Sequence, residues 1–249
     1  MKYRNLLFIV SLLFCSNCII AQKQFSGWLA DFNTVRINNK LSVHSNFQLR
    51  STDKIGHIQT LLLRAGLNYH ISKRFIATGG YAFIHNRRII NSVSGYTGEH
   101  RLWEQLIFNH PLMLGSGTHA RKGTLQHRLR LEQRFIPRSS VVNNELKNDG
   151  SVYAGRLRYF IRNITPLVPW SSTGKAPFLA LQNEAFVNIG DKSSVNGEFF
   201  DQNRAYIAMG YRFHTKFDAE IGYMNQYTNG RGDAFTNNHI VQIATYVRL

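Results

Sequence analysis

Charged side chains at every second position mark residues 124–135, TLQHRLRLEQRF, as the stretch with the strongest potential for chemistry. Its polar phase holds Arg128, Arg130, Glu132 and Arg134, and the intervening positions are mostly leucine. A guanidinium presents a planar fork of N–H donors that matches a carboxylate or a phosphate. The stretch therefore predicts either a ladder of ion pairs or a surface that binds anions.

Other segments repeat this pattern, and they extend the predicted ladder. Long side chains in the same phase of adjacent antiparallel strands come close enough to pair. We predict one connected charge network inside the fold, consisting of Arg128, Arg130, Glu132, Arg134, Arg156, Arg158, Glu184 and Arg204. Arginines exceed acids in the polar phases, so the network is also a candidate site for an anionic solute.

Catalytic and metal-binding patterns are weak in this chain. His44 and Ser45 have the residue types of a hydrolase site, but neighbours on a strand point to opposite faces. The sequence has no Gly-x-Ser-x-Gly elbow, and its histidines are scattered. We therefore predict no enzyme, no metal and no cofactor, and keep a lipid-directed hydrolase only as an alternative.

Alternation of apolar and polar residues recurs along nearly the whole chain and predicts strands with two different faces. Each of the predicted strands has at least 12 residues. Strands of globular proteins usually have about 5–6 residues, whereas a tilted membrane-spanning strand needs about 9–11. The eleven predicted strands are 25–37, 40–52, 58–71, 74–86, 99–111, 124–136, 151–164, 177–189, 200–213, 217–228 and 238–249.

The connections favour an up-and-down barrel. Short turns at 38–40, 72–74 and 214–216 alternate with longer polar loops at 90–98, 137–150, 190–198 and 229–238. Bacterial single-chain barrels have an even number of strands. We predict an all-β, antiparallel up-and-down transmembrane β-barrel of 12 strands, with 10 as the alternative. A soluble β-protein, which would bury the apolar face, is the competing interpretation.

The faces of the predicted barrel follow from the phases. The apolar phase should face lipid, including Leu129, Leu131, Leu157, Leu181 and Ile243, and the charged phase should face the lumen. Trp28, Trp103 and Trp170, with Tyr81, Tyr153, Tyr211 and Tyr223, are candidates for the aromatic girdles at the membrane interfaces.

The first residues have the pattern of an export signal. Lys2 and Arg4 precede an apolar run, and Ala21 offers a small residue at a cleavage point. We predict a signal peptide at 1–21 and a barrel at 22–249, located in the outer membrane of a diderm bacterium. A lipoprotein signal that uses Cys15 or Cys18 is the alternative. Loss of Lys2 and Arg4 lowers the formal charge only from +16 to +14, so the basic character belongs to the barrel.

Six segments, in this order, resemble an uncharacterised family of Bacteroidetes-type outer-membrane β-barrels, known only as a domain of unknown function. They are GEHRLWEQL (98–106), LQHRLRLEQRF (125–135), RLRYFIR (156–162), QNEAFVN (182–188), FDQNRAYIAMGY (200–211) and IGYMNQYTN (221–229). The resemblance covers about residues 25–249. It implies a barrel fold and gives no substrate or reaction.

The functional prediction is a structural or narrow-pore barrel with an Arg-rich lumen. A barrel that binds a partner through its outer loops is the alternative from another class. The expected partners are outer-membrane lipid, the barrel-assembly machinery and an anionic solute. The assembly machinery reads a last strand such as the one that ends at Leu249. Nucleic acid is not expected, because the arginines alternate with apolar residues and so fill a polar interior.

Overall fold

Eleven β-strands account for most of the chain that the structure describes. The structure is a computed structural model that describes residues 22–115, 120–169 and 174–249. The predicted signal peptide therefore lies outside the described residues. The strands are β1 (Gln22–Arg36), β2 (Leu41–Ser51), β3 (Ile58–His70), β4 (Phe75–Ile90), β5 (Val93–Leu114), β6 (Arg121–Val142), β7 (Glu145–Pro166), β8 (Ala176–Ile189), β9 (Phe200–His214), β10 (Phe217–Asn229) and β11 (Phe235–Arg248).

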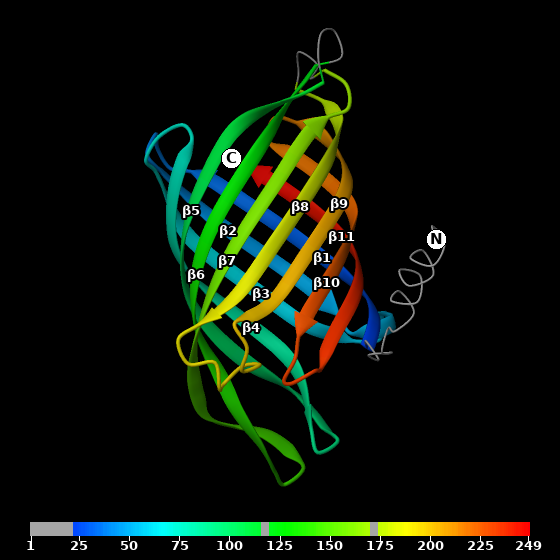
Figure 1. Cartoon of the computed structure of the whole chain (residues 1–249). Coiled ribbons are helices and arrows are strands. Elements are labelled where there is room, and N and C mark those ends of the chain that lie inside the picture. Colours follow the sequence, from blue (N-terminus) through cyan, green and yellow to red (C-terminus); the bar gives the residue numbers. More distant parts are fainter. Residues whose placement is uncertain (1–21, 116–119, 170–173) are drawn as a thin grey trace, which may run out of the picture.

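The strands form one closed barrel (Figure 1). Consecutive strands pair antiparallel, whereas β1 and β11 pair parallel, with Ser26 opposite Ile240. The barrel thus has 11 strands instead of the predicted 12. An odd number of strands can close the sheet because the first and last strands pair parallel. The eleven strands marked in the sequence are the eleven of the barrel.

The two faces of each strand differ as the alternation predicts. On β6, Arg130 and Glu132 point inward and are each 1% exposed, whereas Leu129 points outward and is 48% exposed. The same outward phase holds Leu181 on β8 and Ile243 on β11, both exposed. The barrel therefore carries its large apolar side chains outside and most of its charges inside, the reverse of a water-soluble protein.

Apolar residues also occupy two parts of the interior. One cluster contains Trp28, Phe178, Tyr206, Met224 and Ile240, and the other contains Leu62, Ala82, Ile84 and Trp103. Trp28 and Trp103 are thus lumenal and are not part of an interfacial girdle. Trp170 lies outside the described residues, and the tyrosines proposed with them, such as Tyr81 and Tyr153, are exposed on the outer face.

The two ends of the barrel have different connections. At one end, here called the turn end, residues 37–40, 71–74 and 215–216 join neighbouring strands. At the other end, the loop end, β4–β5 and β6–β7 continue past the barrel as two long hairpins (Figure 1). A 3-10 turn, η1 (Asp53–Ile55), also lies at the loop end. No helix in the described ranges is long and apolar enough to cross a membrane.

The prediction of long loops at 90–98 and 137–150 was wrong, because most of these residues extend the strands. Each hairpin turns at two residues with positive φ, Asn91 and Ser92 in the first and Asn143 and Asn144 in the second. Tight hairpin turns require positive φ at both central residues, and asparagine tolerates it well. Residues 112–114 and 121–123, which lie outside the predicted strands 99–111 and 124–136, likewise continue β5 and β6.

Candidate functional site

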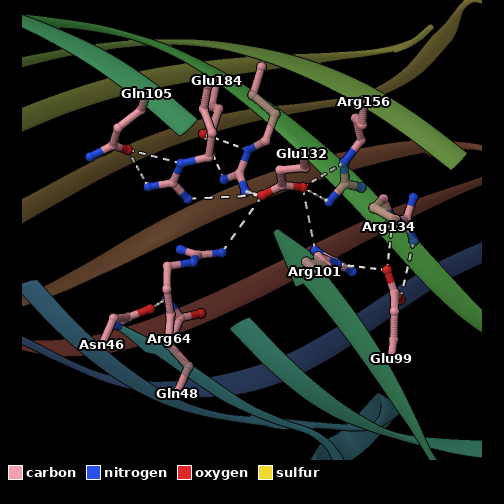
Figure 2. A network of polar contacts seen from close by, with 12 residues as sticks. Asn46, Gln48, Arg64, Glu99, Arg101, Gln105, Glu132, Arg134, Arg156 and Glu184 are labelled. Carbon is pink, nitrogen blue, oxygen red and sulfur yellow. Dashed lines mark hydrogen bonds and ion pairs between the residues drawn. The ribbon is translucent and has the colours of Figure 1, made fainter. Parts of the chain in front are cut away.

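Glu132 on β6 is the centre of the interior charge network (Figure 2). Its carboxylate accepts hydrogen bonds from Arg156 at 2.7 Å and from Arg158 at 2.5 Å. Three more arginines have their nearest nitrogen atom farther from the carboxylate: Arg101 at 3.5 Å, Arg64 at 3.8 Å and Arg130 at 4.0 Å. One acid thus meets five arginines at the middle of the lumen.

Strand register explains why these residues meet. Glu132 lies opposite Arg156 in the β6–β7 pair, and Arg130 lies opposite Arg158. Their side chains share one face of the sheet, and closure of the barrel turns that face inward. Arg64 comes from β3, which is not a neighbour of β6, so its ion pair with Glu132 crosses the lumen.

Three other carboxylates extend the network in different directions. Glu184 on β8 accepts from Arg128 and Arg158, each at 2.7 Å. Glu99 on β5 pairs with Arg101 at 2.6 Å and Arg134 at 2.7 Å, and Asp201 on β9 pairs with Arg156 at 3.0 Å. Because Arg101, Arg156 and Arg158 each contact Glu132 and a second acid, the four carboxylates belong to one connected network.

The structure brings seven of the eight predicted network residues together: Arg128, Arg130, Glu132, Arg134, Arg156, Arg158 and Glu184. Arg204, the eighth, lies opposite Glu184 in the strand register but forms no ion pair with any residue that the structure describes. Its guanidinium lies over the rings of Trp28, at 5.0 Å, and Phe186, at 4.8 Å.

The prediction missed Arg64, Glu99, Arg101 and Asp201. The first three stand in the polar phase of their strands, so the alternation was a signal that could have included them. Asp201 is the residue of β9 that is skipped at an irregularity in the β8–β9 register, where Phe186 lies opposite Gln202 and Val187 opposite Phe200; the sequence does not reveal this irregularity.

Aromatic rings lie under several lumenal arginines. Arg130 lies 4.7 Å from the ring centroid of Trp103, Arg128 4.1 Å from Phe160, and Arg158 4.5 Å from Phe186. Such contacts stabilise a guanidinium that has left bulk water. Trp103 fits inside because Gly80 leaves room: a Cβ atom there would lie 2.6 Å from the indole.

A second ion-pair group lies nearer the turn end. Glu220 on β10 accepts from Arg162 at 2.5 Å, from Tyr246 at 2.8 Å and from Tyr206 at 3.1 Å. Asp218, also on β10, pairs with Arg212 and Arg248, each at 2.8 Å. These groups leave a cavity of about 460 Å³ between them and the Glu132 network.

The structure does not bring His44 and Ser45 together in a hydrolase site. His44 lines the cavity and meets Trp103 edge-on, whereas the serine that contacts a histidine is Ser42, whose hydroxyl lies 2.9 Å from Nε2 of His70. Asn68 donates to the same hydroxyl, and Ser42 is fully buried. A buried lumenal serine of this kind is not presented to a lipid on the outer face.

Within the described residues, no group of three or more His, Cys, Asp or Glu side chains is arranged to hold a metal ion. In the network around Glu132, arginines outnumber carboxylates. The network of Glu99, Glu132, Glu184 and Asp201 with Arg64, Arg101, Arg128, Arg130, Arg134, Arg156 and Arg158 has seven cations and four anions, a net charge of +3. Its chemistry is therefore to bind or repel ions.

Comparisons with known proteins give a family and no activity. No curated protein matches the chain, and no solved structure matches it. A family model described as a protein of unknown function, DUF2490, matches residues 25–237, which include nine complete strands, β2 to β10, and most of the barrel. The chain belongs to the DUF2490 family, whose fold in this member is a closed barrel of eleven strands with a charged lumen.

Proposed function

We propose that the protein is an integral outer-membrane barrel of a diderm bacterium. The observation that carries this proposal is the band of exposed apolar side chains around the barrel, including Leu102, Leu129, Ile207 and Ile221, each between 48% and 56% exposed. A soluble protein rarely exposes so large a continuous apolar surface. In a bilayer the same surface meets hydrocarbon, and the closed sheet leaves no unpaired edge.

Export by residues 1–21 completes the proposal. The basic residues, the apolar run and Ala21 have the order of a cleaved signal peptide. The mature chain would then begin at Gln22, and the barrel-assembly machinery would fold it into the outer-membrane lipid.

The role within the membrane is structural, or that of a narrow pore closed at mid-height. What supports this role is that β3, β5, β6, β7, β8 and β9 all contribute side chains to the ion-pair network around Glu132. Contacts between strands that are not neighbours, such as Arg64 with Glu132, span the lumen. Side chains fixed in this way obstruct the free passage of solutes.

Refolding of residues 22–249 into lipid vesicles tests the membrane proposal. The expected product has a β-type circular dichroism spectrum, resists extraction by carbonate, and migrates differently on a gel before and after boiling. A chain that folds and stays monomeric in buffer without detergent or lipid would overturn it, because a soluble fold cannot expose this apolar band.

A second candidate role, binding of a partner at the cell surface, is favoured by the two hairpins at the loop end. They contact each other, since Leu146 of the β6–β7 hairpin covers Gly95 of the β4–β5 hairpin. Arg138 and Lys147 are exposed on the β6–β7 hairpin. Trypsin added to intact cells should cut at these two residues if the hairpins project outward, and complete protection would contradict this role.

A further inference from the structure

The cavity of about 460 Å³ lies on the turn-end side of the Glu132 network. Arg64, Arg130 and Arg158, which contact Glu132, form its inner wall. Its other end is lined by residues close to the turns, including Ile76 at the start of β4 and Val247 near the end of β11. The cavity therefore extends from the Glu132 network toward the turn end.

The lining of the cavity has a large excess of positive charge. Eight arginines line it, Arg50, Arg64, Arg128, Arg130, Arg158, Arg162, Arg204 and Arg248, and the only carboxylate among the lining residues of the described chain is Glu184. Carboxylates just outside the cavity pair closely with Arg158, Arg162 and Arg248. Arg64 and Arg130 have only distant contacts with Glu132, at 3.8 Å and 4.0 Å, and Arg204 has stacking contacts.

Three buried N–H donors of these arginines are unpaired. Nε of Arg64, Nε of Arg128 and Nη1 of Arg130 have no hydrogen-bond partner in the described structure, and Arg64 and Arg130 are 8% and 1% exposed. Buried donors of charged groups are costly to leave unpaired. The charges of Arg64, Arg128 and Arg158 also act unfavourably on Arg130. An oxyanion among these guanidinium groups would accept the free donors and reduce the repulsion.

The cavity also has an apolar patch toward the turn end, among polar lining residues such as Asn109 and Gln126. Phe32 and Tyr246 stack there at 5.0 Å, and Ile107 and Ile164 add aliphatic surface. Ligand cavities of this volume typically combine an apolar lining with a few convergent polar groups. The arginines beside the network and this apolar patch therefore match a ligand with an anionic head and an apolar body.

We propose that this cavity binds an amphiphilic organic oxyanion, a phosphate monoester or a carboxylate. Its head lies between Arg64, Arg128 and Arg130, and its body extends along Phe32 and Tyr246 toward the turn end. This proposal goes beyond the proposed function, and it does not depend on the membrane location, because only the closed barrel and its lining are needed.

Isothermal titration calorimetry on residues 22–249 in a nonionic detergent tests the proposal with four probes: hexyl phosphate, hexanoate, hexanol and inorganic phosphate. Hexyl phosphate and hexanoate should bind, hexanol should not, and inorganic phosphate should bind more weakly than hexyl phosphate by about tenfold or more, since the apolar contacts are absent. Equal affinity for inorganic phosphate and hexyl phosphate would overturn the amphiphile and leave a plain oxyanion site. No binding of either anion would overturn the site itself.

Matched variants test where the anionic head of the ligand binds. Arg130→Gln and Arg64→Gln should weaken hexyl phosphate about tenfold or more, because each removes a charged donor. Arg134→Gln is the control: it removes an arginine of the same network whose partner is Glu99 and which does not line the cavity. Equal effects of all three variants would refute the placement. If one of these arginine variants fails to fold, tryptophan fluorescence decides: hexyl phosphate should alter the emission of the wild type, whose Trp28 lines the cavity, and Trp28→Phe should lose that change.

Discussion

Replacing Glu132 by alanine tests the interior network where it is most concentrated. The variant leaves five arginines around an empty position, but three of them keep another acid: Arg101 keeps Glu99, Arg156 keeps Asp201, and Arg158 keeps Glu184. Arg64 and Arg130 lose the only carboxylate with which they form an ion pair in the described structure. Removing one partner of a buried pair typically costs about 3–5 kcal/mol. Because most partners retain an acid, we expect a loss of about 3 kcal/mol in the free energy of unfolding.

A second substitution separates charge repulsion from simple loss of packing. Arg64→Ala in the Glu132→Ala background removes the cation that has lost its partner, so the double variant should be less destabilised than the sum of the two single variants by about 1 kcal/mol or more. The control is Glu104→Ala, which removes an exposed glutamate bonded to Gln133 on the outer face. Urea-induced unfolding in lipid vesicles, followed by circular dichroism, measures the wild type and the four variants.

The reasoning would be refuted by additive effects of Glu132→Ala and Arg64→Ala. It would also be refuted if Glu132→Ala cost no more than Glu104→Ala. Either result would mean that water screens the lumenal charges so well that the network contributes little to stability.

Three further predictions concern single positions. Leu129→Arg should lower the free energy of unfolding by about 2–4 kcal/mol if this outward side chain meets hydrocarbon. A spin label at position 129 should then be relaxed by oxygen rather than by an aqueous nickel chelate. Leu131 is a less suitable position, because it lies opposite Glu104, which would pair with a new arginine. Asn144→Val should cost about 1–2 kcal/mol, because φ is 62° there and a β-branched residue resists it, whereas Asn144→Gly should be neutral in the same unfolding assay. Gly80→Ala should destabilise the barrel, since its Cβ would lie 2.3 Å from the carbonyl oxygen of Ala65, and Gly79→Ala, with open space around the added atom, is the control.

Much of the fold was predictable because its signal is local. The side chains of a strand alternate between faces at every residue, so leucines in one phase and arginines in the other define the two faces of β6 without any knowledge of its neighbours. The same rule places Trp103, which shares its phase with Arg101 and Gln105, inside the lumen. Residue type alone assigns the tryptophans to an interfacial girdle, whereas the phase of Trp103 within its strand places it inside.

The features that could not be predicted depend on closure of the sheet. The parallel pairing of β1 with β11 sets the strand number, and nothing within either strand specifies its partner. Likewise, Arg64 meets Glu132 only because the barrel is narrow enough for side chains from β3 and β6 to span it. The long hairpins were mistaken for loops because Asn-Ser and Asn-Asn are polar; those pairs form the two-residue turns, and the flanking residues continue the strands.

Single-channel recording in a planar bilayer tests the central claim, a membrane barrel whose lumen is closed by the Glu132 network. The wild type should insert and show almost no steady conductance, because the ion-paired side chains obstruct the lumen. Glu132→Ala should show discrete openings that favour anions, since the remaining arginines outnumber the acids around them. A large, steady conductance in the wild type, unchanged by Glu132→Ala, would contradict the claim and would identify the protein as an open pore.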